Sequence, residues 1–375
     1  MKSLNYKRLS DNQSVSLDTL RGLAAVIVVI CHCSQLFINQ HLPEYYRFFA
    51  VLAQSCVMIF FVLSGFLITK SITGNIARNG SLDLTDYAIK RFARIYPPLI
   101  FSFVIVAVLT ILSQKFFISG DGSLSTANGW VNKYGFNVAI FGYLPSVIMS
   151  NGFVGDMSPA SNSPLWSLSI EVWYYVIAGL ILSGRKELII AGLAIGYVGI
   201  SNNSPFFYYS IVWVLGAILC LMHDGVIKVS RLATSMALLC AAAYAFYRLF
   251  IIYYNFTNSN LTLVNIALGM LMAALLQKVV IERDIRLSIL PSMASFSYTL
   301  YIIHFPILIF VFGCSQEYSQ DNLNNALIMS AIGFSTSMLI AYISARFVEN
   351  TKLFTSILRK VRISHQTQKN AYVSD

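Results

Sequence analysis

An arginine and a histidine share one face of the first apolar segment of this chain. Arg21 precedes His32 by eleven residues in the stretch Leu17-Asp-Thr-Leu-Arg-Gly-Leu-Ala-Ala-Val-Ile-Val-Val-Ile-Cys-His. In a helix this separation makes almost three turns and a rise of roughly 16 Å, so the two side chains lie at different membrane depths. A centrally buried arginine costs about 2.5 to 3.5 kcal/mol on insertion scales, and ionisable residues inside a membrane usually serve a function. The spacing predicts a track through part of the membrane rather than a contacting pair.

Each of the two side chains could serve chemistry or structure. His32 falls near the bilayer middle, where loss of hydration favours the neutral imidazole, which is a competent general base. It could also only pack two helices through a hydrogen bond. Arg21 could hold an anion that enters from the cytoplasm, or pair with Asp18 one turn earlier and reach toward the membrane surface.

Three more charged residues join the main candidates. Arg91 and Arg94 lie one turn apart, and guanidinium groups bind phosphate well. Basic residues also collect at the cytoplasmic side of membrane proteins in general, which is the alternative for this pair. Glu171 is the only acidic residue within the apolar part of an expected span. Its burial requires a partner such as an arginine, a histidine or a substrate hydroxyl, and a salt bridge that only fixes helix packing is the alternative.

Polar groups also occur in two other apolar segments. Ser64 and Gly65 indicate a close contact between helices, although they could also leave room for a ligand. Pro306 frees the carbonyl near Ile302, and His304 places a polar ring inside the same span, for structure or for function. The weaker candidates of the site are Asp18, Ser64, Trp166, Tyr298 and His304.

No metal site or disulfide framework is expected. The six cysteines fall in or at the ends of apolar segments, where they behave as small apolar residues. Cys31-His32-Cys33 resembles a metal-binding sequence, but consecutive helical residues point about 100° apart and cannot converge on one ion.

The composition is that of a polytopic membrane protein. Of the 375 residues, 57% are hydrophobic and 11% are charged, and the mean hydropathy is +0.66. Apolar stretches long enough to cross about 30 Å of hydrocarbon recur along the whole chain, which predicts an all-α bundle of about ten helices. The expected spans cover residues 17–37, 50–70, 96–114, 164–183, 187–202, 206–222, 232–252, 261–280, 292–313 and 325–345.

Basic residues give the expected topology. With both termini in the cytoplasm, the inner segments hold 21 of the 26 lysines and arginines. The net charge of +10 thus reports topology and contact with anionic lipid, and requires no nucleic-acid partner. The expected organisation is a cytoplasmic leader (1–16), a membrane domain (17–349) and a cytoplasmic tail (350–375), without a cleavable signal peptide.

Three segments outside the expected spans have distinct characters. Residues 71–94 are cytoplasmic by charge and end in a short helix that runs into Pro97. Residues 114–163 form the longest external segment, whose apolar part, 136–149, predicts a re-entrant or interfacial element rather than a span. Residues 351–363 are amphipathic and are expected to lie along the inner leaflet.

Five ordered motifs resemble those of the family 3 membrane acyltransferases, the bacterial inner-membrane enzymes that O-acylate surface polysaccharides and other extracytoplasmic acceptors. The resemblance covers about residues 17 to 349. The motifs are Ser16-Leu-Asp-Thr-Leu-Arg-Gly-Leu-Ala-Ala with His32, Phe60-Phe-Val-Leu-Ser-Gly-Phe-Leu-Ile, Arg91-Phe-Ala-Arg-Ile-Tyr-Pro, Ser163-Pro-Leu-Trp-Ser-Leu-Ser-Ile-Glu and Ser297-Tyr-Thr-Leu-Tyr-Ile-Ile-His-Phe-Pro.

The resemblance implies a donor and roles for these residues. Arg21 and His32 correspond to the family's arginine and histidine motif, Arg91 and Arg94 to its Arg-x-x-Arg motif, and acyl-CoA is implied as the donor substrate, with no permanently bound cofactor. We therefore expect an O-acetyltransferase that uses cytoplasmic acetyl-CoA and a glycan or glycolipid acceptor at the outer face. His32 would deprotonate the acceptor hydroxyl or accept the acyl group transiently, and Glu171 would orient the histidine or bind the acceptor.

Alternatives remain at this stage. Many relatives carry an extra esterase-like domain, so this chain is expected either to complete the transfer or to pass the acyl group to a partner of polysaccharide biosynthesis. A homo-oligomer is also compatible with the sequence. A transporter or flippase is the rival from another class, against which stands the lack of paired broken helices. A lipid acyltransferase with a His-x-x-x-x-Asp motif is excluded, because no histidine has an aspartate five residues on.

Overall fold

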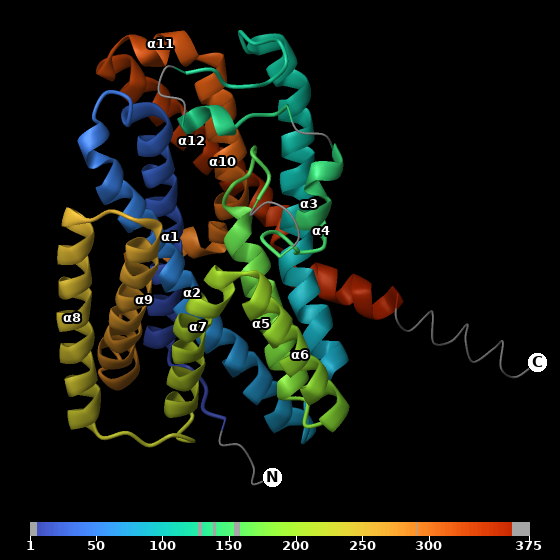
Figure 1. Ribbon diagram of the computed structural model, residues 1–375. Coiled ribbons are helices and arrows are strands. Elements are labelled where there is room, and N and C mark those ends of the chain that lie inside the picture. Colours follow the sequence, from blue (N-terminus) through green and yellow to red (C-terminus); the bar gives the residue numbers. More distant parts are fainter. Residues whose placement is uncertain (1–5, 127–129, 138–139, 154–157, 290, 362–375) are drawn as a thin grey trace, which may run out of the picture.

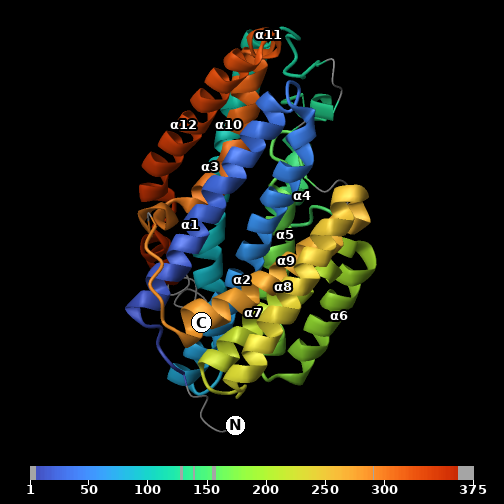
Figure 2. The ribbon, with the colours of Figure 1, turned by 90° about the vertical axis from the view of Figure 1, so that its left-hand side faces the viewer.

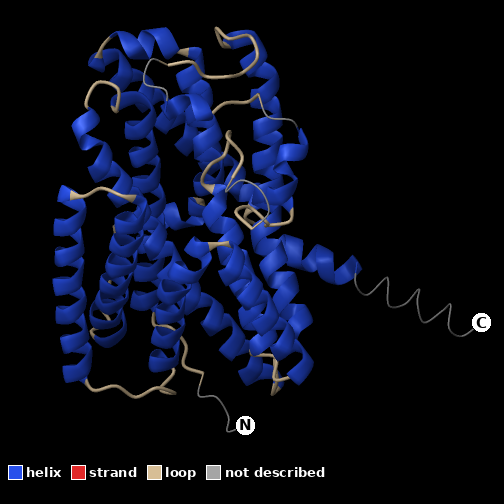
Figure 3. Ribbon diagram, viewed as in Figure 1, coloured by secondary structure: helices blue, strands red, loops and turns tan. Residues whose placement is uncertain are grey.

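Ten helices occupy the ten segments that were expected to span the membrane (Figure 1). The computed structural model describes residues 6–126, 130–137, 140–153, 158–289 and 291–361. Within these ranges Figure 3 shows helices joined by loops, so the expected all-α bundle is confirmed. The ten helices are α1 (Asp11–Cys33), α2 (Tyr46–Asn79), α3 (Leu84–Phe116), α5 (Leu165–Ile181), α6 (Lys186–Asn202), α7 (Ser204–His223), α8 (Arg231–Tyr254), α9 (Asn258–Leu275), α10 (Ser297–Cys314) and α12 (Leu323–Val348).

Eight of the described helices are long and apolar enough to cross a membrane. The other two, α5 and α6, have 17 residues each. At 1.5 Å per residue such a helix is roughly 26 Å long, slightly shorter than the hydrocarbon layer. The chain is a multi-pass membrane protein with eight full-length candidate spans and two shorter helices.

The first helix starts inside the expected leader and ends in an irregular turn. Ser10 caps α1 by accepting a hydrogen bond from the backbone of Gln13, whose side chain accepts in return from the backbone of Ser10. After Cys33 the helix continues as a π-helical turn, Ser34–Ile38. Such wide turns occur frequently at functional sites, and this one begins two residues after His32.

The prediction that a short helix ends at Pro97 is wrong. Helix α3 is continuous, with Pro97 and Pro98 inside it. A proline removes a backbone donor, but neighbouring side chains can compensate in a membrane bundle. The two prolines leave the carbonyls of Ala93 and Arg94 without helical donors, and one residue further on the hydroxyl of Tyr298 on α10 donates to the carbonyl of Ile95, 3.1 Å away. Because α3 is continuous, Arg91 and Arg94 belong to the same helix as the span that follows them.

Helix α2 lies at the centre of the bundle and crosses α7 closely. A side chain at Gly65 would collide with the Trp213 carbonyl, and one at Gly216 would collide with the Val62 carbonyl. The expected small-residue contact at Gly65 is therefore confirmed. Helix α8 lies at the left edge of the bundle in Figure 1, the side that faces the viewer in Figure 2, and only 11% of its most apolar stretch is buried.

The long external segment folds against the bundle instead of crossing the membrane. In its apolar part the described residues form a 3₁₀ turn (Ile140–Tyr143) and a short helix, α4 (Leu144–Val147), and residues 138–139 lie outside the described ranges. Phe136 and Met149 are buried in the main apolar core, and the indole of Trp173 donates to the Met149 carbonyl at 2.7 Å. Residues 136–149 thus form no continuous span.

The chain forms one more helix after α12. Residues 351–361 are helical, as expected for the amphipathic tail, and residues 362–363 lie outside the described part. This segment, called the C-terminal helix below, does not only face lipid. Its polar residues line a cavity of the bundle, and its position along the inner leaflet stays a prediction.

Candidate functional site

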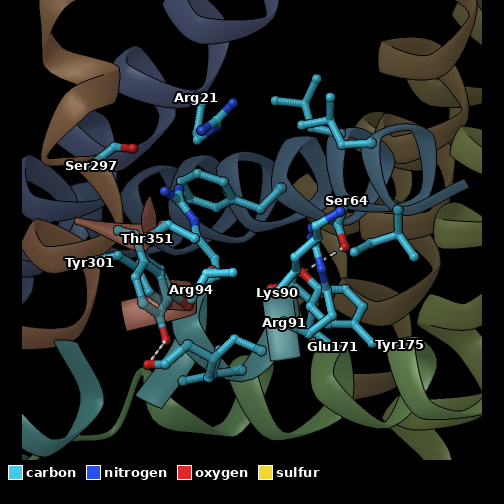
Figure 4. Close-up of a pocket in the computed structure, with 18 of the residues that line it drawn as sticks. Arg21, Ser64, Lys90, Arg91, Arg94, Glu171, Tyr175, Ser297, Tyr301 and Thr351 are labelled. Carbon is cyan, nitrogen blue, oxygen red and sulfur yellow. Dashed lines mark hydrogen bonds between the residues drawn. The ribbon is translucent and has the colours of Figure 1, made fainter. Parts of the chain in front are cut away.

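A cavity of about 790 Å³ lies between the helices of the bundle (Figure 4). Helices α1, α2, α3, α5 and α10 and the C-terminal helix form its walls. Of the predicted site residues, the cavity brings together Arg21, Ser64, Arg91, Arg94, Glu171 and Tyr298. Four further basic residues line it: Lys90, Lys352, Arg359 and Lys360.

Some of these cations are neutralised by acidic partners. Arg21 forms an ion pair with Asp18 at 2.9 Å, as the alternative for this residue predicted, yet still lines the cavity. Arg94 pairs at 3.4 Å with Glu349, whose other carboxylate oxygen accepts from the backbone and hydroxyl of Thr299.

Arg91, unlike Arg21 and Arg94, forms no ion pair with an acidic side chain among the described residues. It contacts Ser71 at 3.5 Å and lies over the Tyr87 ring, but its buried Nε has no hydrogen-bond partner among the described residues. A buried donor without an acceptor is costly, so a ligand acceptor would satisfy it.

Glu171 takes its partner from its own helix. The hydroxyl of Tyr175, one turn later, donates to its carboxylate, and Ser64 donates to the Tyr175 oxygen at 3.3 Å. Ser64 in turn accepts from the indole of Trp213 at 3.1 Å. The expected contact between Glu171 and His32 is absent from the described structure, so Glu171 does not orient the histidine. It lies in the wall of the basic cavity.

The inner end of the cavity is closed by an aromatic layer. Tyr301 and Ser167 share a hydrogen bond of 2.6 Å, and the Phe60 ring packs edge-on against Tyr301 at 5.4 Å. All three residues line the cavity. The Tyr301 ring lies 6.1 Å from that of His304, which places the next polar group directly behind this layer.

Behind the layer His32 and His304 form a stacked pair. Their ring centroids are 5.1 Å apart with an interplanar angle of 18°, and His32 Nδ1 lies 2.8 Å from His304 Nε2. His304 is fully buried, and its Nδ1 lies 3.0 Å from the carbonyl of Leu300. His304 is thus brought to His32, although the two are 272 residues apart.

A residue of the external segment binds the backbone carbonyl that Pro306 frees in α10. Pro306 leaves the carbonyl of Ile302 without its helical donor, as expected, and the side chain of Asn162 donates to that carbonyl at 2.8 Å. Asn162 is fully buried, and its Oδ1 has no partner among the described residues. The start of α5 is therefore fastened to α10 within one turn of His304.

A tyrosine of the external segment covers the pair from the other side. Tyr134 packs edge-on against Phe305, and Phe305 packs in the same way against His32, each at 5.1 Å. Burial raises the pKa of the Tyr134 phenol to about 12. At neutral pH it therefore keeps its proton.

Some predicted residues lie elsewhere, and one cluster was missed. Trp166 packs against Tyr209 and does not line the cavity. Lys70 is buried in an ion pair with Asp224 and lies 2.9 Å from Nδ1 of His223. Lys70, His223 and Asp224 form the missed cluster. All three lie at the ends of apolar segments, where the sequence does not indicate whether a side chain is buried. Among the described residues, no group of histidine, cysteine and acidic side chains could hold a metal ion, and all six cysteines are free.

Fold and site first define a class of protein: a multi-pass helical membrane protein with a basic cavity and, behind an aromatic layer at its inner end, a buried histidine pair. The sequence then identifies the family, because the acyltransferase domain of the family 3 acyltransferases matches residues 14–346. The chain belongs to this family. It is a membrane acyltransferase, and the relatives that resemble it along most of its length identify it as an O-acetyltransferase.

Three relatives illustrate the similarity. The acyltransferase MdmB of Streptomyces mycarofaciens is 25% identical over 78% of this chain and 78% of its own length. The O-acetyl transferase of Shigella phage Sf6 is 25% identical over 90% of this chain and 93% of its own length. The peptidoglycan O-acetyltransferase OatA of Listeria monocytogenes is 29% identical over 45% of this chain, but the match covers only 24% of that protein. No solved structure matches the chain.

Proposed function

We propose that this protein transfers an acetyl group from cytoplasmic acetyl-CoA to a sugar hydroxyl at the outer face of a bacterial inner membrane. The observation that carries the proposal is the cavity, whose wall holds seven basic side chains against one acidic side chain, Glu171. CoA is an elongated polyanion with an uncharged pantetheine arm. A basic mouth and an aromatic inner end match these two parts.

The donor would bind with its phosphates at the mouth and its thioester at the inner end. Arg21, Arg91 and Arg94 would hold phosphate oxygens, for which guanidinium groups are well suited. The acyl end would lie against Tyr301 and Phe60. Because Tyr301 separates this point from the histidine pair, transfer requires Tyr301 to move away from its hydrogen bond with Ser167.

The histidine contacts favour one arrangement of protons. If Nδ1 of His304 donates to the Leu300 carbonyl, its Nε2 accepts from Nδ1 of His32. Nε2 of His32 then carries a free lone pair, which is what a general base needs. His304 would act as a positioning residue, because it fixes the tautomer and the ring orientation of His32.

In the proposed reaction the acetyl group moves from the sulfur of CoA to the oxygen of the acceptor hydroxyl. Nε2 of His32 takes the proton of the acceptor hydroxyl, and the hydroxyl oxygen forms a bond to the thioester carbonyl carbon. The carbon–sulfur bond breaks, and the leaving thiolate takes the proton back from the imidazolium. The products are an O-acetyl ester and CoA with a free thiol, and His32 returns to its initial state.

The acceptor is the least defined part of the proposal. The Listeria relative is named a peptidoglycan O-acetyltransferase, which supports a glycan acceptor here as well. Tyr134 packs on Phe305, a neighbour of His32, and Oδ1 of Asn162 has no partner among the described residues, so these groups would be available to bind a sugar hydroxyl close to the histidine pair. In an alternative scheme the chain passes the acyl group to a separate partner enzyme.

Acyl-CoA turnover by the purified protein tests the proposal. Protein in nanodiscs should release CoA thiol from acetyl-CoA when a sugar acceptor is present, and His32→Ala protein should not. Mass spectrometry of glycans from cells with and without the gene identifies the acceptor. A transporter would move a solute without releasing CoA, so a lack of CoA release with every acceptor tried, including acceptors from the parent cells, would contradict the proposal.

A further inference from the structure

The C-terminal helix turns its polar face into the cavity. Six of its eleven residues line the cavity wall, and all six are hydroxyl or basic residues: Thr351, Lys352, Thr355, Ser356, Arg359 and Lys360. The apolar residues Leu353, Ile357 and Val361 are 49%, 45% and 50% exposed. A helix that only rested on a bilayer would keep its basic face toward water and head groups. This orientation instead indicates a binding wall.

Two ion pairs hold the helix against the first turns of α3. Glu349, just before the helix, pairs with Arg94 at 3.4 Å, and Arg359, near its end, pairs with Asp86. Asp86 also binds Lys90 at 2.5 Å. Because Asp86 precedes Arg94 by eight residues, the two attachment points lie about 12 Å apart along α3. The cavity therefore has two levels of positive charge: an inner level at Arg94, and an outer level at Lys90 and Arg359.

Two cations of this helix are available to a ligand. Neither Lys352 nor Lys360 forms an ion pair within the described part of the chain, whereas Arg359 is committed to Asp86. Lys352 lies close in sequence to Glu349 and so to the inner level, and Lys360 adjoins Arg359 at the outer level. Between them Thr355 and Ser356 offer hydroxyl groups to the same cavity.

We propose that the C-terminal helix recognises the phosphate that lies farthest from the thioester, the ribose 3′-phosphate of the CoA donor. This inference rests on the proposed function. A donor with its thioester at Tyr301 brings its diphosphate to the inner level, near Arg94 and Lys352. Its 3′-phosphate then reaches the outer level, where Lys360 binds it. The helix thereby distinguishes CoA from nucleotides and pantetheine esters that lack this phosphate.

The test compares acetyl-CoA with 3′-dephospho-acetyl-CoA by calorimetric titration of the full-length protein in nanodiscs. Lys360→Ala should weaken acetyl-CoA binding by roughly three- to tenfold at low ionic strength, as for a partly solvated ion pair, and leave 3′-dephospho-acetyl-CoA binding unchanged. Lys352→Ala should weaken binding of both compounds. Lys186→Ala is the matched control, because it removes one exposed basic residue outside the cavity and should change neither.

Each other outcome overturns the proposal in a distinct way. If the parent protein does not bind acetyl-CoA, the proposed donor and the role of the helix both fail. If the parent binds and Lys360→Ala behaves like Lys186→Ala, only the role of the helix fails. Equal weakening of both compounds by Lys360→Ala would exclude the 3′-phosphate. If the effect of Lys360→Ala appears only in nanodiscs with anionic lipid, the helix binds lipid phosphates instead.

Discussion

His32 and His304 approach each other across the interface of α1 and α10, with Nδ1 of the first 2.8 Å from Nε2 of the second. One partner of His304 is a backbone carbonyl, which cannot donate a proton. With both rings neutral, the pair can form both hydrogen bonds only if Nδ1 of His32 donates to Nε2 of His304 and Nδ1 of His304 donates to the Leu300 carbonyl. This direction gives different expectations for the two histidines.

Replacement of His32 should abolish the chemical step. His32→Ala is expected to lower the acetyl transfer rate about 10²-fold or more, since positioned proton transfer contributes about 10² to 10⁴. Affinity for acetyl-CoA should change little, because His32 does not line the cavity. His41→Ala serves as a control, since His41 contacts the Ser319 carbonyl at the far end of α1. Near-parental turnover of His32→Ala would move the chemistry to another residue.

Replacement of His304 should have a smaller effect that can be rescued in part. His304→Ala leaves Nδ1 of His32 without its acceptor, so we expect kcat to fall about tenfold or more while KM for the donor stays unchanged. In His304→Gln the side-chain carbonyl can accept from His32, and part of the rate should return. If alanine and glutamine gave the same rate, His304 would contribute packing alone.

The arginines of the cavity should show the opposite kinetic pattern. Arg91→Ala and Arg21→Ala are expected to raise the donor KM about tenfold, because hydrogen bonds with charged groups contribute about 1.5 to 3 kcal/mol. The effect on kcat at saturating donor should be small. Arg185→Ala, in the exposed turn before α6, removes the same charge elsewhere. An unchanged donor KM in the Arg91 and Arg21 variants would reduce both residues to topology signals.

The crossing of α2 and α7 should tolerate no added atoms. Gly65→Ala is expected to destabilise the protein by about 1 to 3 kcal/mol, because its Cβ meets the Trp213 carbonyl. Gly196→Ala in α6 is the matched control, since the nearest atom would lie 3.9 Å away. Thermal unfolding in detergent measures both variants. A Gly65→Ala protein as stable as the control would mean that the helices separate at this point without cost.

The expected topology can be tested by accessibility. Single cysteines at positions 80 and 355 should be labelled from the cytoplasmic side, and those at 125 and 318 from the outside, in a background without the native cysteines. This follows from the charge asymmetry of the connecting segments. Labelling of positions 80 and 318 from the same side would exclude the arrangement with ten membrane helices.

The sequence predicted the helices well because their signals are local. Apolar length located all ten helices, and small residues located the contact at Gly65. The continuous α3 was not predicted, because a proline usually ends a helix at the preceding residue, and the packing of α3 against α10, which includes the hydrogen bond from Tyr298 to Ile95, joins residues 203 positions apart. The helical period showed the amphipathic character of residues 351–361 but not which face meets protein, since that depends on Asp86.

The sequence predicted which residues form the site better than it predicted which residues contact one another. Arg21, Arg91, Arg94 and Glu171 do share one cavity. Glu171 was assigned the wrong neighbour, because a tyrosine on its own helix satisfies the carboxylate. The partner of His32 follows from tertiary packing alone, which no spacing within α1 reveals.

The hydrogen bond between Ser167 and Tyr301 also affects how easily protons and ions could cross the membrane through this protein. A bundle that opened a basic cavity on one side and a sugar site on the other would offer protons and ions a continuous aqueous path, and would dissipate the gradients that the membrane maintains. Tyr301, Ser167 and Phe60 interrupt such a path with a layer one side chain thick. In the proposed reaction, this layer would let the protein use substrates from two compartments while the membrane remains electrically tight.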